Sequence, residues 1–386
     1  MSISYSVGQA FSVEARDAVA KAVYEARISM GSAKVNFAIV IASVEYDFQA
    51  VFNAAKTQIG DIPMIGVSTT GELTNQGSHR RSVVVALIEG EELECQSDWQ
   101  GDFSSNSVRA MRDLLSALSL TSERKGLLML MADGLGGDYD EMLQQLPPGR
   151  YKMAGCLAGG DLRLGRTHQF GGNHSGYDGL AGAFLESEEL RVGIGSAHGW
   201  HSVGASFEVS GVGGKWVRSL DGETATDGYA KYFGRPAKEW RVPPLNTLVR
   251  LYPLGVVRGD KPLMVRSPLH VEADGSLRMN ASLSEGETAQ LMIGSREKCI
   301  AAARQATQDA LAQLAGASPK MALVFADISW QMLFQGFEGA EVEAIREVIG
   351  DRVPIAGGYT FGQLTNMADA PRPEFLNQHI EVILFA

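Results

Sequence analysis

The sequence predicts an α/β (α+β) protein in which repeated helix-strand-helix-strand-strand units form mixed sheets, with an inserted β-rich segment. Three observations support this fold class. A glycine motif occurs three times along the 386 residues. An amphipathic helix and a continuous apolar run precede each motif, and another apolar run follows it. Before the third unit lies a glycine-rich stretch with many β-forming residues, which predicts the inserted segment.

The glycine motif reads Gly-x4-Gly, then Glu, Asp or Gln, then Leu, at residues 62–77, 152–162 and 353–368. Its paired positions are Gly66 and Gly71, Gly155 and Gly160, and Gly357 and Gly362, followed by Glu72, Asp161 and Gln363. In one interpretation the backbone approaches a small ligand, and Glu72 or Asp161 recognises an amine. The favoured interpretation is structural, because glycine permits tight strand packing and a binding site with one charged group is rarely copied with three different residues.

The flanks of the motif repeat in the same order. Apolar runs that predict fully buried strands lie at residues 37–42, 127–132 and 321–326, and each is followed by Ser43, Asp133 or Asp327. Helical spacing of apolar residues predicts helices within residues 15–30, 108–118 and 300–314. Return strands are predicted at residues 83–88, 180–185 and 380–385. The order implies a parallel pair joined by a crossover and then an antiparallel strand.

The segment 190–292 differs in composition, because it is rich in β-forming residues and glycine turns. It predicts a helix at residues 224–233, strands around residues 248–251, 263–265 and 277–281, and a hairpin turn at Asp274-Gly275. We place a boundary near residue 205. It separates an N-terminal domain, residues 1–205, from a C-terminal domain, residues 206–386.

Composition excludes several classes of protein. An apolar fraction of 45% and a charged fraction of 20% are typical of a folded chain. The net charge of −11 argues against nucleic-acid binding, and every apolar run is too short for a membrane span. Three scattered cysteines without a CxxC pair, and an N-terminus without a signal-peptide pattern, predict a cytoplasmic location.

Two further features bear on catalysis. The loop after residue 132 carries Asp133, Asp138, Asp140 and Glu141, which suits a metal or amine site but more often caps a helix. Cys156 is either a reactive thiol or, more commonly, a buried apolar one. Nucleotide-binding motifs of the GxGxxG and Walker A types do not occur. We therefore expect no enzyme, and a hydrolase that uses Cys156 or the acidic loop is the alternative.

Four histidines are candidate ligands of an iron porphyrin. His168 and His174 lie in a glycine-rich stretch, and His198 and His201 flank Trp200. Arg266 is a candidate partner for a propionate or another carboxylate, because its guanidinium forms forked hydrogen bonds. The alternative for each histidine is a hydrogen-bonded structural role, and for Arg266 a surface ion pair.

As an ordered series, the motifs resemble the FIST sensory proteins, which have an N-terminal and a C-terminal FIST domain. The resemblance covers nearly the whole chain and rests on residues 65–72, 155–161, 198–200, 220–223 with Tyr229, 265–266 and 354–362. The sequence departs from the family at Asp327, where Cys is frequent, and at Gln363, where Glu is frequent. Any activity attached to those two positions is therefore not carried over.

The resemblance implies a cytoplasmic sensor of small ligands in bacterial signal transduction, with amino acids as the usual suggestion. Some stand-alone members of this length resemble the haemoproteins called NosP, which sense nitric oxide. That likeness implies haem as a cofactor, and as partner a sensor histidine kinase or a cyclic-di-GMP enzyme (a diguanylate cyclase or phosphodiesterase). A second copy of the chain is an optional partner. The haem sensor, the haem-free amino-acid sensor, the hydrolase and a purely structural scaffold remain the alternatives at this point.

Overall fold

A computed structural model describes residues 3–31, 34–161, 164–366 and 372–386. The chain divides into two compact units. Unit 1 comprises Met1–His198, Ile300–Phe375 and His379–Ala386, and unit 2 comprises Gly199–Cys299 and Leu376–Gln378. Leu162 and Ala368, which end two of the predicted motif copies, lie outside the described residues.

Unit 1 contains three repeats of one supersecondary structure. Repeat A consists of β1 (Ser4–Phe11), α1 (Ala15–Met30), β2 (Phe37–Ser43), α2 (Phe48–Ile59), β3 (Met64–Thr69), β4 (Glu72–Thr74), β5 (Gly77–His79) and β6 (Ser82–Glu89). Repeat B consists of β7 (Glu94–Gln100), α3 (Ser107–Ala117), β8 (Leu127–Ala132), α4 (Tyr139–Leu143), β9 (Lys152–Leu157), β10 (His168–Gly171), β11 (His174–Tyr177) and β12 (Leu180–Glu186). Repeat C consists of β13 (Val192–Ala197), α8 (Arg296–Ala312), β22 (Met321–Asp327), α9 (Ile328–Leu333), α10 (Ala340–Ile349), β23 (Ile355–Thr360), β24 (Gln363–Thr365), β25 (Glu374–Leu376) and β26 (Ile380–Phe385).

Strand pairing is the same in each repeat and confirms the predicted fold class. The parallel pairs are β2 with β3, β8 with β9, and β22 with β23. The antiparallel return strands β6, β12 and β26 lie on the other side of β2, β8 and β22. The strands β1, β7 and β13 then pair with the return strands.

The three sheets are joined by exchanged hairpin strands. The β4–β5 hairpin of repeat A extends the sheet of repeat C, β10–β11 of repeat B extends that of repeat A, and β24 of repeat C pairs with β9 of repeat B. Each sheet therefore has six strands. Each repeat lends a hairpin strand to a neighbour and receives one from the other neighbour.

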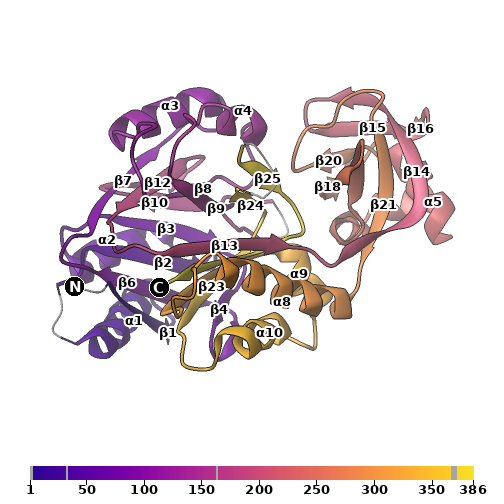
Figure 1. Ribbon diagram of the computed structural model, residues 1–386. Coiled ribbons are helices and arrows are strands. Elements are labelled where there is room, and N and C mark those ends of the chain that lie inside the picture. Colours follow the sequence, from indigo (N-terminus) through magenta and orange to yellow (C-terminus); the bar gives the residue numbers. More distant parts are fainter. Residues whose placement is uncertain (1–2, 32–33, 162–163, 367–371) are drawn as a thin grey trace. The chain divides into compact units, whose positions relative to one another are not determined.

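The sheets pack their inner faces into one apolar core and carry helices on the outside. The shared core includes Ile39 of β2, Met129 of β8 and Leu323 of β22, all fully buried. On the outer face of the first sheet, Val40 packs with residues of α1 and α2. Figure 1 shows α3 and α4 over the sheet of β8 and β12, and α1 beside β1 and β6. Burial of apolar area in this core is the main stabilising term for unit 1.

The first glycine of each motif occupies the same register position. Gly66, Gly155 and Gly357 lie opposite Val40, Leu130 and Val324, respectively. A Cβ atom on Gly155 would lie 1.9 Å from the carbonyl oxygen of Leu130, and one on Gly66 would lie 2.2 Å from the Phe170 ring of an exchanged hairpin. The structural interpretation of these glycines is therefore correct, because a side chain has no room.

Unit 2 is the inserted β-rich segment. It consists of β14 (Trp200–Gly213), β15 (Trp216–Leu220), β16 (Glu223–Thr224), α5 (Ala225–Phe233), α6 (Ala237–Trp240), α7 (Leu245–Leu248), a 3-10 turn at Val249–Leu251, β17 (Leu254–Arg258), β18 (Lys261–Arg266), β19 (Pro268–Val271), β20 (Leu277–Met279) and β21 (Thr288–Gly294). Its strands form a single sheet around a core that contains Trp240 and Tyr229.

Most elements predicted in this segment are confirmed, and one is wrong. Helix α5, strands β18 and β20, and the turn at Asp274-Gly275 lie where the sequence placed them. The predicted strand at residues 248–251 is instead helical, with Leu248 N donating to Pro244 O and Tyr252 N to Val249 O. A short apolar run fits either state by periodicity alone. The boundary near residue 205 is a statement about sequence domains that the division into compact units does not test, and it stays a prediction.

Candidate functional site

A pocket of about 360 Å³ lies in unit 1. All three repeats contribute to its wall. The lining residues are Val44, Glu45, Thr70 and Arg80 from repeat A, Gly160 and Asp161 from repeat B, and Ile328, Gln331, Met332 and Gln335 from repeat C. A site that draws on three repeats exists only when unit 1 is folded.

The ends of the central strands position the pocket. Val44 directly follows β2, Thr70 directly follows β3, and Ile328 begins α9 directly after β22. The Val44 N–H donates to the carbonyl oxygen of Thr69 at 2.9 Å, which ties the first two segments together. Ligand sites of α/β sheets lie at the carboxyl ends of the strands. The pocket therefore occupies the expected end of the sheet.

Backbone hydrogen bonds between the glycine motifs fix the floor of this region. The Gly159 N–H donates to Ser68 O, and the Ser68 hydroxyl donates to Gly159 O, each at 2.7 Å. Thr70 N donates to Tyr359 O at 3.1 Å, and Tyr359 N donates to Gly71 O at 2.8 Å. The motifs of repeats A, B and C are thus directly bonded to one another. Their function in the fold is to hold the repeats together beside the pocket.

The pocket combines an apolar interior with charged groups at its mouth. Glu45, Asp161 and Arg80 are exposed, whereas Ile328 is buried. The Thr70 hydroxyl donates to Gln331 Oε1 at 2.9 Å, and Gln331 Nε2 donates to Thr70 O at 3.2 Å. Two carboxylates attract a cation and one guanidinium attracts an anion. This arrangement suits a small ligand that carries both an amine and a carboxylate.

A buried carboxyl group lies directly behind the pocket wall. Glu72 is fully buried, and it accepts hydrogen bonds from the Thr69 hydroxyl at 2.7 Å, the Ser82 N–H at 2.9 Å and the Ser82 hydroxyl at 2.7 Å. Burial raises the pKa of Glu72 from 4.5 to about 7, and these hydrogen bonds limit the rise. Nearby Glu45 raises the pKa of Glu72 further.

The structural equivalents of Glu72 differ from those that the motif suggests. Glu72 pairs in register with Gly358, Gln363 with Cys156, and Gln169 with Val67. Each partner follows the first glycine of its motif, so Gln169 occupies the position for which the sequence pattern suggests Asp161. The reason is a longer connection between β9 and β10, in which Asp161 lies and lines the pocket.

Comparison with protein-family models identifies two adjacent domains. Residues 36–223 match the FIST N domain and residues 225–366 match the FIST C domain. The chain belongs to the FIST family. FIST domains are small-ligand sensing domains of signal transduction.

Two solved structures align with the whole length of this FIST protein but have low sequence identity and low structural similarity to it. A crystal structure of cyanuric acid hydrolase from A. caulinodans is 8% identical over 100% of this chain and 99% of that chain, with a TM-score of 0.36. A second cyanuric acid hydrolase structure is 8% identical over 100% of both chains, with a TM-score of 0.34. None of the curated protein sequences matches this chain.

The histidines predicted as haem ligands lie in separate places of the FIST protein. In the β10–β11 hairpin, His168 pairs with Tyr177 at one end and His174 with Gly171 at the other. The His168 ring stacks on Phe48, and burial lowers its pKa. His174 is exposed, and its Nδ1 lies 3.6 Å from a carboxylate oxygen of Asp98. The structure does not bring His168 and His174 together.

The other three predicted haem-binding residues, His198, His201 and Arg266, lie outside the β10–β11 hairpin. The His198 ring, at the end of unit 1, lies 4.6 Å from the His379 ring between centroids. His201 is half-buried on β14 of unit 2, and Arg266 is buried at the end of β18. None of the five predicted residues lines the described pocket of unit 1. Whether any of them binds haem stays a prediction.

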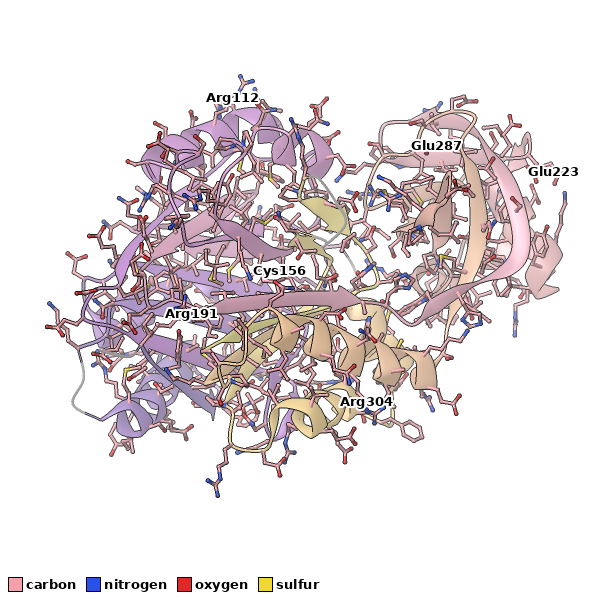
Figure 2. The ribbon with its side chains drawn as sticks, viewed as in Figure 1. Arg112, Cys156, Arg191, Glu223, Glu287 and Arg304 are labelled. Atoms are coloured by element: carbon pink, nitrogen blue, oxygen red, sulfur yellow. The ribbon has the colours of Figure 1, made fainter. Side chains whose placement is uncertain are left out.

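The acidic loop has hydrogen-bond partners within the fold, and Cys156 is buried. Asp133 Oδ1 accepts hydrogen bonds from the N–H groups of Leu135 and Gly136, and Asp138 caps α4 by accepting from Glu141 N at 2.8 Å. The interpretation of this loop as a cap is therefore correct. Figure 2 shows Cys156 among the strands of unit 1; it is fully buried, and burial raises the pKa of its thiol well above the usual value. A buried, protonated thiol is a poor nucleophile.

Sequence reasoning found only part of the pocket. Thr70 and Asp161 belong to the predicted motifs, whereas Glu45, Arg80 and Gln331 were missed. The signal for Glu45 is its place two residues after Ser43, which directly follows the predicted strand. Within the described residues, no helix is long and apolar enough to span a membrane. The same residues contain no cluster of three or more His, Cys, Asp or Glu side chains that suits a metal ion.

Proposed function

We propose that this FIST-domain chain is a sensor of small ligands, and that an amino-acid-type ligand binds in the pocket of unit 1. The observation that carries the proposal is the combination of Glu45, Asp161 and Arg80 around one apolar pocket. A volume of about 360 Å³ lies at the lower end of the range for small-molecule sites. An α-amino acid has the matching charges, with an ammonium for the carboxylates and a carboxylate for Arg80.

The apolar lining indicates which amino acids to test first. Val44, Ile328 and Met332 offer aliphatic and thioether surface, and the amide of Gln331 is already bonded to Thr70. A branched aliphatic side chain gains free energy by leaving water for such surface. L-Leucine is therefore the first probe, and L-aspartate, whose side chain would be desolvated there, is its comparison.

The proposal is tested by calorimetric titration with L-leucine. Because each of these charges contacts the ligand, we expect Glu45→Gln and Arg80→Gln to weaken binding by about tenfold, which corresponds to one charge-assisted hydrogen bond of about 1.4 kcal/mol. Arg112→Gln is the matched control, since this arginine lies on α3 away from the pocket and bonds to Gln145. Equal affinity in all three variants, or no amino acid that binds in a panel of twenty, would contradict the proposal.

Haem remains an alternative ligand with a test of its own. Protein purified after growth with a haem supply is expected to show a Soret band if the NosP-like hypothesis is correct. Alanine variants of His198 and His201, and then of His168 and His174, identify the iron ligand. Colourless protein that does not take up haemin removes this alternative.

The sensor proposal has three further parts. The protein acts in the cytoplasm and has no catalytic activity, and it passes its signal to a sensor histidine kinase or a cyclic-di-GMP enzyme.

A further inference from the structure

Glu72 joins the segments that form the repeat A side of the pocket. Its Oε1 accepts from Thr69, which is adjacent to the pocket residue Thr70, and its Oε2 accepts twice from Ser82, two residues after Arg80. The backbone of Thr69 in turn holds Val44. A change at Glu72 therefore reaches the pocket through two short connections.

The hydrogen bonds of Glu72 exist in full only while it is ionised. A carboxylate accepts all three bonds, whereas a protonated carboxyl group has one O–H that must donate. The Ser82 N–H cannot reverse its direction, and the Ser82 hydroxyl already accepts a hydrogen bond from Gln9 Nε2 at 3.2 Å. The Thr69 hydroxyl can reverse its direction, because it has a second acceptor in the carbonyl oxygen of Ala42, 3.2 Å away. Protonation of Glu72 thus redirects the Thr69 hydroxyl from Glu72 to the end of β2.

Repeat C contains the neutral counterpart of this arrangement. Gln363 replaces Glu72. In the amide orientation that satisfies both neighbours, its Nε2 donates to His379 O and its Oε1 accepts from Asp327 N, at 3.1 Å each. The equivalent hydroxyl, that of Thr360, lies 3.4 Å from Ala326 O, which corresponds to Ala42 O. An uncharged residue at this position is therefore compatible with the fold. The acid in repeat A differs from this glutamine in that it can ionise.

We propose that Glu72 is a positioning residue of the pocket, and that its carboxylate form sets the Thr69–Thr70 segment in the arrangement that accepts a cationic group beside Glu45. The inference rests on the proposed function, because it assumes an ammonium-bearing ligand. A cation that enters beside Glu45 favours the carboxylate over the carboxyl form. Binding then releases the Glu72 proton to solvent, and affinity rises with pH.

Several other groups titrate or carry charge on the elements around Glu72. They are Glu45 and Tyr46 after β2, His79 on β5, Arg80 and Arg81 before β6, and Tyr359 on β23. Burial raises the pKa of Tyr46 and Tyr359, so both remain neutral at pH 6–8, and burial lowers the pKa of His79. His79 is therefore the group whose titration could be mistaken for that of Glu72, and the experiment needs a variant that lacks it.

The first experiment needs no ligand. Amide resonances of Val44, Thr70 and Arg80 are followed between pH 5.5 and 8.5 in the full-length protein. We expect one shared titration midpoint in the wild type and none in Glu72→Gln. In Thr69→Val, which lacks the hydroxyl that reverses, the shifts of Val44 and Thr70 should shrink, whereas Arg80, connected through Ser82, keeps its titration. His79→Asn keeps the titration. A flat wild-type profile, or the same titration in Glu72→Gln, would overturn the inference.

The second experiment measures L-leucine affinity at pH 6 and pH 8. We expect the wild type to bind about threefold or more tightly at pH 8, and Glu72→Gln to change less than about 1.5-fold, since linkage allows at most tenfold per pH unit for one proton. If L-leucine fails to bind at either pH while the amide titration is present, the ligand class is wrong and the positioning role of Glu72 stands. Binding that is equally pH-dependent in Glu72→Gln rejects that role.

Discussion

Glu381 is a carboxyl group inside an apolar core. It is fully buried on β26, and the Gly155 N–H donates to its Oε2 at 3.3 Å. Its Oε1 has no hydrogen bond of full geometry within the described part of the chain, although the side chain of Thr365 is close enough to lower the pKa of Glu381 against the effect of burial. The register places Val84 and Ala181 at the same position in repeats A and B, opposite Ile41 and Met131 as Glu381 lies opposite Phe325. The fold therefore accepts apolar residues where repeat C has an acid.

We predict that Glu381 makes unit 1 less stable as pH rises. Burial raises the pKa of Glu381 from 4.5 to about 8. The neutral form favours folding below about pH 4.5, and this contribution is lost as pH rises toward about 8, because the unfolded chain has already released the proton. The free energy of unfolding should fall by up to about 1.4 kcal/mol per pH unit between pH 5 and 8. Glu72 contributes in the same direction.

Denaturant titrations at pH 5, 6, 7 and 8 measure this slope. Glu381→Gln keeps the shape of the side chain but cannot ionise, so its slope should be clearly smaller than that of the wild type. Glu94→Gln is the control, because Glu94 is exposed on β7. Identical slopes in wild type and Glu381→Gln would show that Glu381 does not titrate in this window.

At the scale of single elements, α9 links the stability of repeat C to the pocket. Asp327 ends β22 and caps α9, since its Oδ1 accepts from the Ser329 N–H at 2.9 Å and the Ser329 hydroxyl at 2.7 Å. The helix supplies Ile328, Gln331 and Met332 to the pocket. Loss of this cap should therefore affect both folding and binding.

We predict that Asp327→Ala lowers the free energy of unfolding by about 1 kcal/mol or more and weakens L-leucine binding. Asp138→Ala is the matched variant, because Asp138 caps α4, which contributes no lining residue to the pocket. It should lower stability to a similar extent and leave the affinity unchanged. Denaturant titration and calorimetry distinguish the two effects. An equal loss of affinity in both variants would mean that the cap acts only through global stability.

Most central strands of unit 1 and the helices that flank them could be predicted from the sequence. Continuous apolar runs identified β2, β8 and β22. Of the helix caps, the loop that contains Asp138 was interpreted as one, whereas the caps Asp47 of α2 and Asp327 of α9 were not predicted. The wrong element, residues 248–251, is a short apolar run in which helix and strand patterns coincide. Arg80 was missed because its place in the pocket depends on the turn between β5 and β6, which has no apolar pattern.

At the scale of the whole molecule, the exchanged hairpin strands should make unit 1 unfold as one body. No repeat can lose its fold without removing a strand from a neighbouring sheet. We predict that Met131→Ala in repeat B, which creates a cavity costing about 2–5 kcal/mol, accelerates amide exchange of β2, β8 and β22 by the same factor. Faster exchange in β8 alone would show that the repeats unfold separately.

Hairpin exchange also marks the limit of sequence-based prediction for this chain. The repeats were visible because their residues recur at fixed spacing, but the pairing of β4 with β23 joins segments almost three hundred positions apart, about which local patterns carry no information. The same limit explains the wrong equivalence of Asp161 with Glu72. Only the strand register shows that Gln169 occupies that position.

The ends of the inserted segment have a consequence for engineering. A Cβ atom on Gly199 would lie 2.4 Å from the backbone nitrogen of Cys299, so the chain enters and leaves this segment at almost one point. The inserted segment can therefore be replaced as a unit. A linker of a few small residues between His198 and Ile300 would connect β13 to the rest of α8, which is the strand-to-helix order that repeats A and B already have. A different domain whose own termini lie close together could be inserted at the same position.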